Sequence, residues 1–291
     1  MKYIFVNLKR FDVPPESGGV NRLAPPEKWA ETIIVKVRSG IEKYHTSTQY
    51  SGGVSFTFFF PEAHLLHALG SRGSSTLSIG CQGVHWDDVS KGGNFGAYTT
   101  LRPAAAMAGI GCTAAIIGHC EERRALASVL LEGGVETSAS GAAINRLLGK
   151  EIAAARSRNL KVLYCIGEKA GEEEQWQEVL SSQLKAGLSA APGDALVIGY
   201  EPVWAIGPGK KPPNRSHIER TARFIKERAR EGFGIPDIPI VYGGGLKADN
   251  AEMLASIPEI SGGLIALTRF SGEIGFYPEE FLEIVDRYLG G

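Results

Sequence analysis

A glutamate opens an apolar, glycine-ended segment in the second half of the chain. Glu201 follows the β-rich run Leu196 to Gly199, and the segment after it ends in Gly207 and Gly209. Pro202 fixes the backbone beside the carboxylate, whereas the two glycines permit the dihedral changes of a hinge. A loop of this kind can close over a catalytic base and exclude water from it. The same residue types also fit a buried ion pair, so the motif alone leaves two interpretations open.

A histidine stands where a second apolar run gives way to charged residues. His119 follows the run Ala114 to Ile117 and comes directly before Cys120-Glu121-Glu122, which has the composition of a helix start. The N-terminus of a helix favours the neutral form of imidazole. A neutral histidine can donate a hydrogen bond to a substrate carbonyl and stabilise an enediolate. A histidine that only caps the helix is the alternative.

An asparagine and a lysine end the first apolar run of the chain. Asn7 and Lys9 are two residues apart, so they share one side of an extended strand. Lys9 could supply positive charge to a phosphate or an enediolate oxygen, with Glu121 as its counter-ion. A surface lysine at a strand end is the competing interpretation.

These residues need a scaffold, and short β-rich runs alternating with amphipathic stretches predict one. Such alternation indicates parallel strands with helical crossovers, and eight units in this length favour a closed (β/α)₈ TIM barrel of the α/β class. We expect residues 1–291 to form a single domain. The predicted strands are Tyr3–Val6, Val54–Phe60, Leu77–Cys81, Ala114–Ile117, Val162–Ile166, Leu196–Gly199, Pro239–Tyr242 and Leu264–Leu267, and the clearest predicted helices are Trp29–Lys43, Gly141–Arg158, Glu172–Ala186, Arg215–Arg230 and Pro278–Leu289.

Charge and composition exclude several classes of partner. The formal net charge is −1 and the basic residues are not clustered, which argues against nucleic acid or an anionic membrane. The chain has no signal-like start and no long apolar run, so we expect a cytoplasmic protein. The four cysteines lack metal-ligand spacing, and no dinucleotide-binding glycine motif is present, so the sequence predicts no metal and no cofactor.

Taken in order, the motifs resemble those of the triosephosphate isomerase family over nearly the whole chain. They are Asn-x-Lys from Asn7, Gly-His-x-Glu from Gly118, Cys-Ile-Gly-Glu from Cys165, Tyr-Glu-Pro-Val-Trp-Ala-Ile-Gly-x-Gly-Lys from Tyr200, and Tyr-Gly-Gly from Tyr242. The resemblance implies a (β/α)₈ barrel, a homodimer, and aldose–ketose interconversion of a small phosphorylated sugar without metal or organic cofactor.

The same resemblance implies roles for single residues. Glu201 would be the base and His119 the group that polarises the carbonyl, while Asn7 and Lys9 hold oxygens and Glu121 pairs with the lysine. Two further residues, Glu168 and Trp204, would help to seat the lid. Thr99 would reach into the active site of a neighbouring subunit, and Cys120 stands where the family usually has serine.

The phosphate-binding segments depart from the family pattern. The amides of Gly207 and Gly245 would still donate to a phosphate, although the serine expected after Gly244 is absent. At the eighth strand the usual glycine pair is replaced by Ala266-Leu267, or by Thr268-Arg269 if one residue is inserted. We therefore expect Leu267, Thr268 and Arg269 to border the phosphate, with the Arg269 guanidinium compensating for lost amide contacts.

Other departures concern the interface and the substrate. Lys91 to Asn94 lengthens the loop of the expected interface, Thr100-Leu101 replaces a usual Gly-Glu, and Glu122 stands where arginine is common. The sequence predicts interconversion of glyceraldehyde 3-phosphate and dihydroxyacetone phosphate. His85-Trp86 and an arginine near the eighth strand also resemble a branch that isomerises tetrulose phosphates, such as erythrulose phosphate. A barrel that binds sugar phosphates without turnover is the third possibility.

Overall fold

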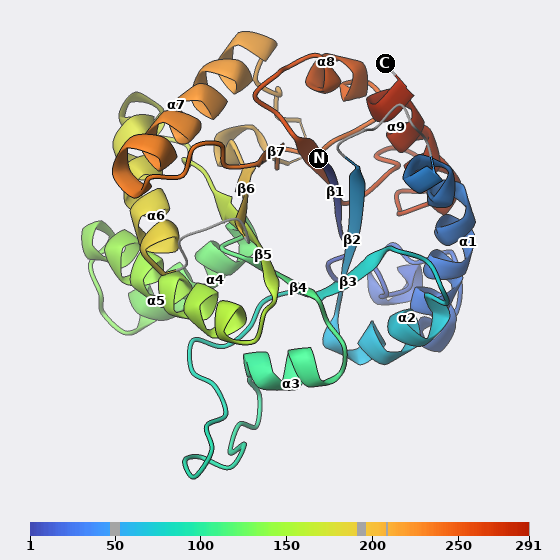
Figure 1. Ribbon diagram of the computed structural model, residues 1–291, viewed down its shortest axis with the longest axis horizontal. Helices are drawn as coiled ribbons and strands as arrows, with labels where there is room; N and C mark the ends of the chain where they lie inside the picture. Colours follow the sequence, from blue (N-terminus) through green and yellow to red (C-terminus); the bar gives the residue numbers. More distant parts are fainter. Residues whose placement is uncertain (47–52, 191–195, 208, 291) are drawn as a thin grey trace.

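A computed structural model describes residues 1–46, 53–190, 196–207 and 209–290; Pro208 of the expected lid lies outside them. Eight parallel strands close a barrel in which each strand pairs with its neighbours in chain order (Figure 1). The predicted (β/α)₈ barrel is thereby confirmed. The strands are β1 (Lys2–Asn7), β2 (Val54–Phe60), β3 (Ser78–Cys81), β4 (Ala114–Ile117), β5 (Lys161–Ile166), β6 (Leu196–Tyr200), β7 (Ile240–Tyr242) and β8 (Gly262–Ile265).

Helices surround the strands as an outer ring (Figure 1). The α-helices are α1 (Pro26–Thr46), α2 (Leu65–Ser71), α3 (Ala104–Gly109), α4 (Cys120–Glu132), α5 (Thr137–Ser157), α6 (Trp176–Ala190), α7 (Arg215–Phe233), α8 (Ala251–Ala255) and α9 (Pro278–Gly290), and the 3₁₀ turns are η1 (Pro15–Ser17), η2 (Glu62–His64), η3 (Glu173–Gln175) and η4 (Val203–Ala205). The helices absent from the sequence prediction are α2, α3 and α8, which are short, and α4, whose apolar residues Leu126 and Leu130 are only partly buried against the core. Their apolar pattern is therefore weak. Within the described ranges, no helix combines the length and the apolar composition needed to span a membrane.

Alternating side chains fill both faces of the barrel wall. Phe5 and Phe59 point into the barrel and stack with their ring centroids 5.8 Å apart. Their neighbours Val6, Phe58 and Phe60 belong to the larger apolar layer between strands and helices. The interior is therefore a packed core, and chemistry is confined to the ends of the strands.

The eighth strand begins earlier than its apolar run suggests. β8 covers Gly262–Ile265, where the sequence predicted Leu264–Leu267. A Cβ at Gly262 would lie 1.7 Å from the carbonyl oxygen of Tyr3 on β1, so only glycine can pair at that point. Ala266 and Leu267 consequently follow the end of the strand directly, at the face where barrels place their active sites.

The connection from β3 to α3 extends away from the barrel as an arm, defined here as residues 83–103 (Figure 1). Its base is fixed because Arg158 forms an ion pair with Asp88, whose Oδ1 accepts a hydrogen bond from the amide of Ala105. Apolar side chains on the arm face solvent, and Phe95 is 86% exposed. The arm therefore presents apolar surface that its own chain does not cover.

Candidate active site

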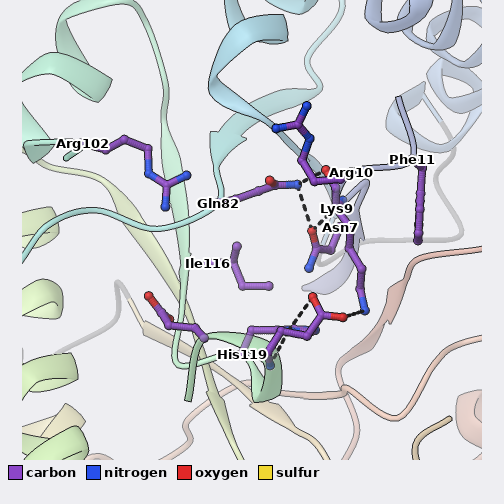
Figure 2. Close-up of a pocket in the computed structure, with 10 residues that line it drawn as sticks. Asn7, Lys9, Arg10, Phe11, Gln82, Arg102, Ile116 and His119 are labelled. Carbon is purple, nitrogen blue, oxygen red and sulfur yellow. Dashed lines mark hydrogen bonds and ion pairs between the residues drawn. The ribbon is translucent and has the colours of Figure 1, made fainter. Parts of the chain in front are cut away.

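A cavity of about 460 Å³ opens at the carboxyl ends of β1, β3 and β4 (Figure 2). Its lining brings together four of the residues singled out from the sequence, since Asn7, Lys9, His119 and Glu121 all border it. The complete lining is Asn7, Lys9, Arg10, Phe11, Gln82, Arg102, Ile116, His119, Glu121 and Glu122. Cationic, anionic and amide groups therefore converge on one space.

Lys9 is held in an unusual backbone conformation at this cavity. Its φ of 42° lies in the left-handed region, and its amide donates to Asn7 Oδ1 at 3.1 Å. Gln82 fixes both residues, because its Nε2 donates to Asn7 Oδ1 at 3.2 Å and to the Lys9 carbonyl at 3.0 Å. The sequence analysis missed this role of Gln82, since the contact joins residues more than 70 positions apart. The expected counter-ion is present: Lys9 Nζ lies 2.7 Å from Glu121 Oε1.

His119 caps the N-terminus of α4 as an uncharged imidazole. Its Nδ1 accepts a hydrogen bond from the Glu121 amide at 3.3 Å, which assigns the ring proton to Nε2. Burial lowers the pKa of His119 to about 4, and the positive charges of Lys9 and Arg124 act in the same direction. The ring therefore presents a neutral N–H donor at physiological pH.

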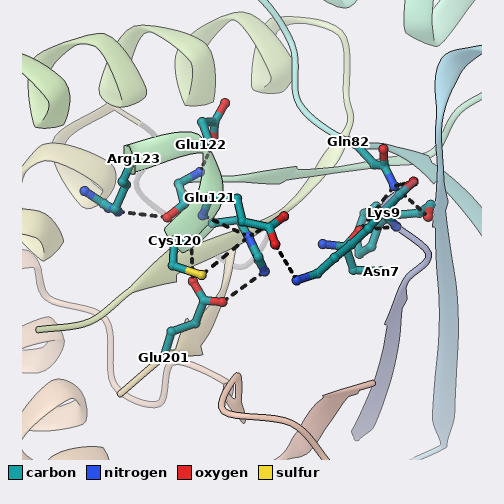
Figure 3. Close-up of polar contacts among 11 residues, drawn as sticks. Asn7, Lys9, Gln82, Cys120, Glu121, Glu122, Arg123 and Glu201 are labelled. Carbon is teal, nitrogen blue, oxygen red and sulfur yellow. Dashed lines mark hydrogen bonds and ion pairs between the residues drawn. The ribbon is translucent and has the colours of Figure 1, made fainter. Parts of the chain in front are cut away.

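Glu201 is the buried partner of this histidine, and its side chain is only 2% exposed. Oε2 accepts the backbone N–H of Cys120 at 2.9 Å, as Figure 3 shows. Oε1 lies 3.2 Å from His119 Nε2 but has no well-formed hydrogen bond among the described residues. Burial raises the pKa of Glu201 to about 8, against the opposing effects of the Cys120 amide, Lys9 and Arg123. Once ionised, this carboxylate is a stronger base than an exposed one.

A second buried glutamate anchors the segment that follows Glu201. Glu168 Oε1 accepts hydrogen bonds from Tyr200 Oη at 2.9 Å and from Trp204 Nε1 at 2.7 Å. His217, at the start of α7, lies 2.9 Å from Tyr200 Oη through its Nε2, a contact that no sequence motif indicated. Trp204 precedes the glycine-ended loop and His217 follows it, and both lie close to the carboxylate of Glu168.

Of the five residues expected to bind or border the phosphate, some have a backbone N–H that is already hydrogen-bonded and others do not. Among the described residues, the N–H groups of Gly207, Gly245 and Leu267 have no backbone acceptor. The amides of Thr268 and Arg269 both donate to the carbonyl of Gly275, each at 3.1 Å. None of the five residues lines the cavity in Figure 2. Only the first three therefore have a backbone donor ready for an anion.

Comparison with known proteins fits this arrangement of base, histidine and lysine. A family model described as triosephosphate isomerase matches residues 28–287. The chain belongs to the triosephosphate isomerase family. A triosephosphate isomerase from Halorhodospira halophila is 34% identical over 239 residues, which cover 79% of this chain and 85% of that protein. One from Nitrosomonas europaea is 37% identical over 177 residues, covering 58% and 64% respectively.

A solved structure supports the fold independently. The crystal structure of triosephosphate isomerase from Bartonella henselae matches with a TM-score of 0.70 and 24% identity, over 99% of this chain and 98% of that one. The barrel fold is therefore shared with that structure over nearly the whole chain.

This family member pairs the guanidinium of Arg269 within its own chain. Its Nε donates to Glu280 Oε1 at 2.7 Å, and the group lies 3.9 Å from the centre of the Tyr277 ring. Thr268 Oγ1 donates to the other oxygen of Glu280 at 3.0 Å. A phosphate that used the Arg269 side chain would have to compete with this carboxylate.

Residue 122 is a half-buried acid at the start of α4. Glu122 Oε2 accepts the Gly118 amide at 2.5 Å, and its carboxyl hydrogen-bonds to Glu151. Burial, together with the charge of Glu122, raises the pKa of Glu151 to about 10, so the two acids share a proton at neutral pH. Arg102 of the arm lies on the other side of Glu122: a Cβ at Gly83 would meet Glu122 Oε1 at 3.4 Å and Arg102 Nη2 at 3.5 Å. The sequence analysis foresaw neither Glu151 nor Arg102.

Thr99 lies farther along the same arm. Its side chain is exposed, and it does not border the cavity of its own chain.

Proposed function

We propose that this chain interconverts glyceraldehyde 3-phosphate and dihydroxyacetone phosphate. The observation that carries the proposal is the contact between Glu201 and His119, a buried carboxyl of raised pKa 3.2 Å from a neutral imidazole nitrogen. This combination of glutamate base and uncharged histidine is the mechanism established for triosephosphate isomerase. Family membership supports the same substrate class.

The proposed reaction moves one proton between neighbouring carbons. Ionised Glu201 removes the proton from the carbon next to the carbonyl, while His119 Nε2–H donates to the carbonyl oxygen. The resulting enediolate carries negative charge that the ammonium of Lys9 and the amide of Asn7 stabilise. Glu201 then returns the proton to the adjacent carbon, while the former hydroxyl oxygen gives up its proton and the former carbonyl oxygen takes one up, a transfer that His119 relays. Glu121 keeps the lysine in place through its ion pair. Every step uses groups of the chain itself.

The phosphate is proposed to bind the free amides at the opposite end of the substrate. Gly207, Gly245 and Leu267 have N–H groups with no backbone acceptor among the described residues, which supports their role as donors. Thr268 and Arg269 are proposed to border the same site with their side chains, since their own amides are occupied by Gly275.

A homodimer is proposed as the working assembly. The arm carries exposed Trp86, Phe95 and Leu101, and its own chain leaves a cavity open beside Lys9. We propose that the arm of a second copy enters this cavity and that Thr99 makes the contact. We also propose that the protein works in the cytoplasm.

The variant Thr99→Arg should place a cation against Lys9 and shift the protein from dimer to monomer in sedimentation analysis. Thr100→Arg, one residue along, is the control, and an unchanged dimer in the Thr99 variant would refute the contact.

The activity is tested directly with purified protein. Turnover of glyceraldehyde 3-phosphate would be measured beside erythrulose and erythrose phosphates, with Glu201→Gln as the blank. We expect triose turnover that the variant lacks. Faster turnover of the four-carbon phosphates would instead indicate that the altered residues after β8 change the substrate specificity. Binding without turnover of any substrate would contradict the proposed activity.

A further inference from the structure

A thiol lies between the two proposed catalytic groups. Cys120 Sγ is 3.8 Å from His119 Nδ1, and His119 Nε2 is 3.2 Å from Glu201 Oε1. One ligand atom from each of the three residues can be chosen so that all lie within 4.8 Å of one another. In Figure 3 the sulfur of Cys120 lies next to the carboxylate of Glu201. Imidazole, thiol and carboxylate therefore form one cluster of possible ligands.

These three donors are the usual zinc ligands of proteins. With Zn–S and Zn–N bonds of about 2.3 and 2.0 Å, tetrahedral ligands are separated by roughly 3.3 to 3.6 Å. The three ligand atoms lie within 4.8 Å of one another, so their separations exceed that requirement by at most about 1.5 Å. Small side-chain rotations would close the group around a cation, while His119 borders the cavity and leaves a fourth position open on that side.

An independent observation also points to a cation. Glu201 is 2% exposed, yet its Oε1 makes no well-formed hydrogen bond among the described residues, because His119 Nε2 lies 3.2 Å away without the geometry of one. A buried carboxylate oxygen without a donor is unfavourable, and a bound cation would satisfy it. The imidazole is uncharged, and Nε2, the nitrogen beside Glu201, gains the lone pair that metal binding requires when its proton moves to Nδ1 and the hydrogen bond from the Glu121 amide to Nδ1 is given up.

The charged residues nearby include both signs, so they neither prevent nor strongly favour the binding of a cation. Lys9 and Arg123 are the cations that act on Glu201, and Arg124 acts on His119 and Cys120. Glu121 opposes them and forms the ion pair with Lys9. The donor set therefore decides affinity, and the thiol is its strongest member for a soft cation.

We propose that His119, Cys120 and Glu201 form a binding site for Zn²⁺, and that an ion bound there blocks isomerisation. On binding, the Cys120 S–H bond breaks, a Zn–S bond forms, and the proton leaves to solvent; any proton on Glu201 leaves in the same way. The His119 ring proton moves from Nε2 to Nδ1, so that Nε2 can form the Zn–N bond. The ion then occupies the base and the imidazole together. A serine at position 120, the usual residue of the family, would offer only a weak ligand, so inhibition is expected to depend on the thiol.

Metal binding is measured on the whole protein without substrate. Calorimetric titration with Zn²⁺ should give one site per chain, and Mg²⁺ should show none. Co²⁺ should produce the absorption bands of a thiolate-bound ion in the wild type. Cys120→Ser should lose those bands and bind Zn²⁺ more than about tenfold more weakly. Cys112→Ser changes a buried thiol outside the group and should keep both signals.

The proposed inhibition by Zn²⁺ rests on the proposed isomerase function, whereas the proposed binding of Zn²⁺ does not. Zn²⁺ should inhibit triose turnover of the wild type at concentrations that leave Cys120→Ser active. The serine variant should retain turnover, because the Cys120 backbone amide, not its thiol, contacts Glu201. If Cys120→Ser does not fold, Cys120→Ala serves in its place. Equal Zn²⁺ affinity in wild type and variant, or no saturable binding to the wild type, would overturn the site; binding without inhibition would overturn the block.

Discussion

His119 Nε2 and Glu201 Oε1 lie 3.2 Å apart at the end of the barrel, although 82 positions of sequence separate the two residues. Burial acts on both groups and favours the neutral form of each: the pKa of the histidine falls to about 4 and that of the glutamate rises to about 8. The pair therefore combines an uncharged hydrogen-bond donor with a base whose strength exceeds that of a solvated carboxylate.

Removing the base should abolish most of the activity without harming the fold. Glu201→Gln keeps the side-chain shape but cannot accept a proton, so kcat should fall by at least about 10²-fold. Steady-state kinetics and circular dichroism would measure activity and folding together. Glu252→Gln, on the exposed face of α8, is the matched control and should remain fully active. A Glu201→Gln variant with wild-type kcat would rule out Glu201 as the base.

The raised pKa of Glu201 predicts how activity depends on pH. Only the ionised carboxylate can remove a proton, so kcat/KM should rise with pH and reach half of its plateau near pH 8. His119 should add no inflection above its own pKa of about 4. A kcat/KM profile that is flat from pH 6 to 9 would show that the carboxyl is ionised throughout.

The same group predicts a pH dependence of stability. The folded protein holds the Glu201 proton up to about pH 8, whereas the unfolded chain releases it near the ordinary value of 4.5. The folded state therefore binds more protons between these values, and the contribution of Glu201 to stability declines as pH rises through that window. Urea denaturation of the wild type and Glu201→Gln should show a free-energy difference that shifts in favour of the variant from pH 5 to pH 8. A difference independent of pH would contradict this account.

Gln82 should matter for the placement of Lys9. Gln82→Leu removes the donor to Asn7 Oδ1 and to the Lys9 carbonyl. Asn7 Oδ1 then keeps only the Lys9 amide, and the Lys9 carbonyl loses its hydrogen bond beside the cavity. We expect destabilisation of about 1 to 3 kcal/mol and a fall in kcat larger than any rise in KM, because Lys9 loses its position near the developing charge. Thermal denaturation and steady-state kinetics would measure the two effects. Gln175→Leu, on the exposed turn η3, is the control and should change neither.

Arg269 tests the altered phosphate end. If its guanidinium contributes to phosphate binding despite the ion pair with Glu280, Arg269→Ala should raise KM by roughly three- to tenfold and leave kcat nearly unchanged. Arg287→Ala, which breaks a similar pair with Glu283 on the outside of α9, should leave KM unchanged. Equal KM values for wild type and Arg269→Ala would show that Arg269 does not bind the phosphate and only stabilises the turn after β8.

The sequence by itself determined the fold and named the candidate catalytic residues, because both depend on local patterns. Alternating β-rich runs and amphipathic stretches specify parallel strands with helical crossovers. The residues Asn7, Lys9, His119 and Glu201 lie at a strand end or within two residues after it. In a closed parallel barrel all such ends meet on one face. The start of β8 was misjudged, since the approach of Tyr3 that demands Gly262 is a contact between distant parts of the chain.

Only the tertiary structure decided which groups touch and which charges they carry. Three contacts join residues whose spacing in the sequence does not predict that they touch. They are the hydrogen bond from Gln82 to Lys9, the proton shared by Glu122 and Glu151, and the Cys120 thiol near Glu201. Burial sets the pKa values of His119 and Glu201, and burial is a property of the assembled barrel. A sequence names an acid or a base, whereas its strength depends on the water and charges that the fold leaves around it.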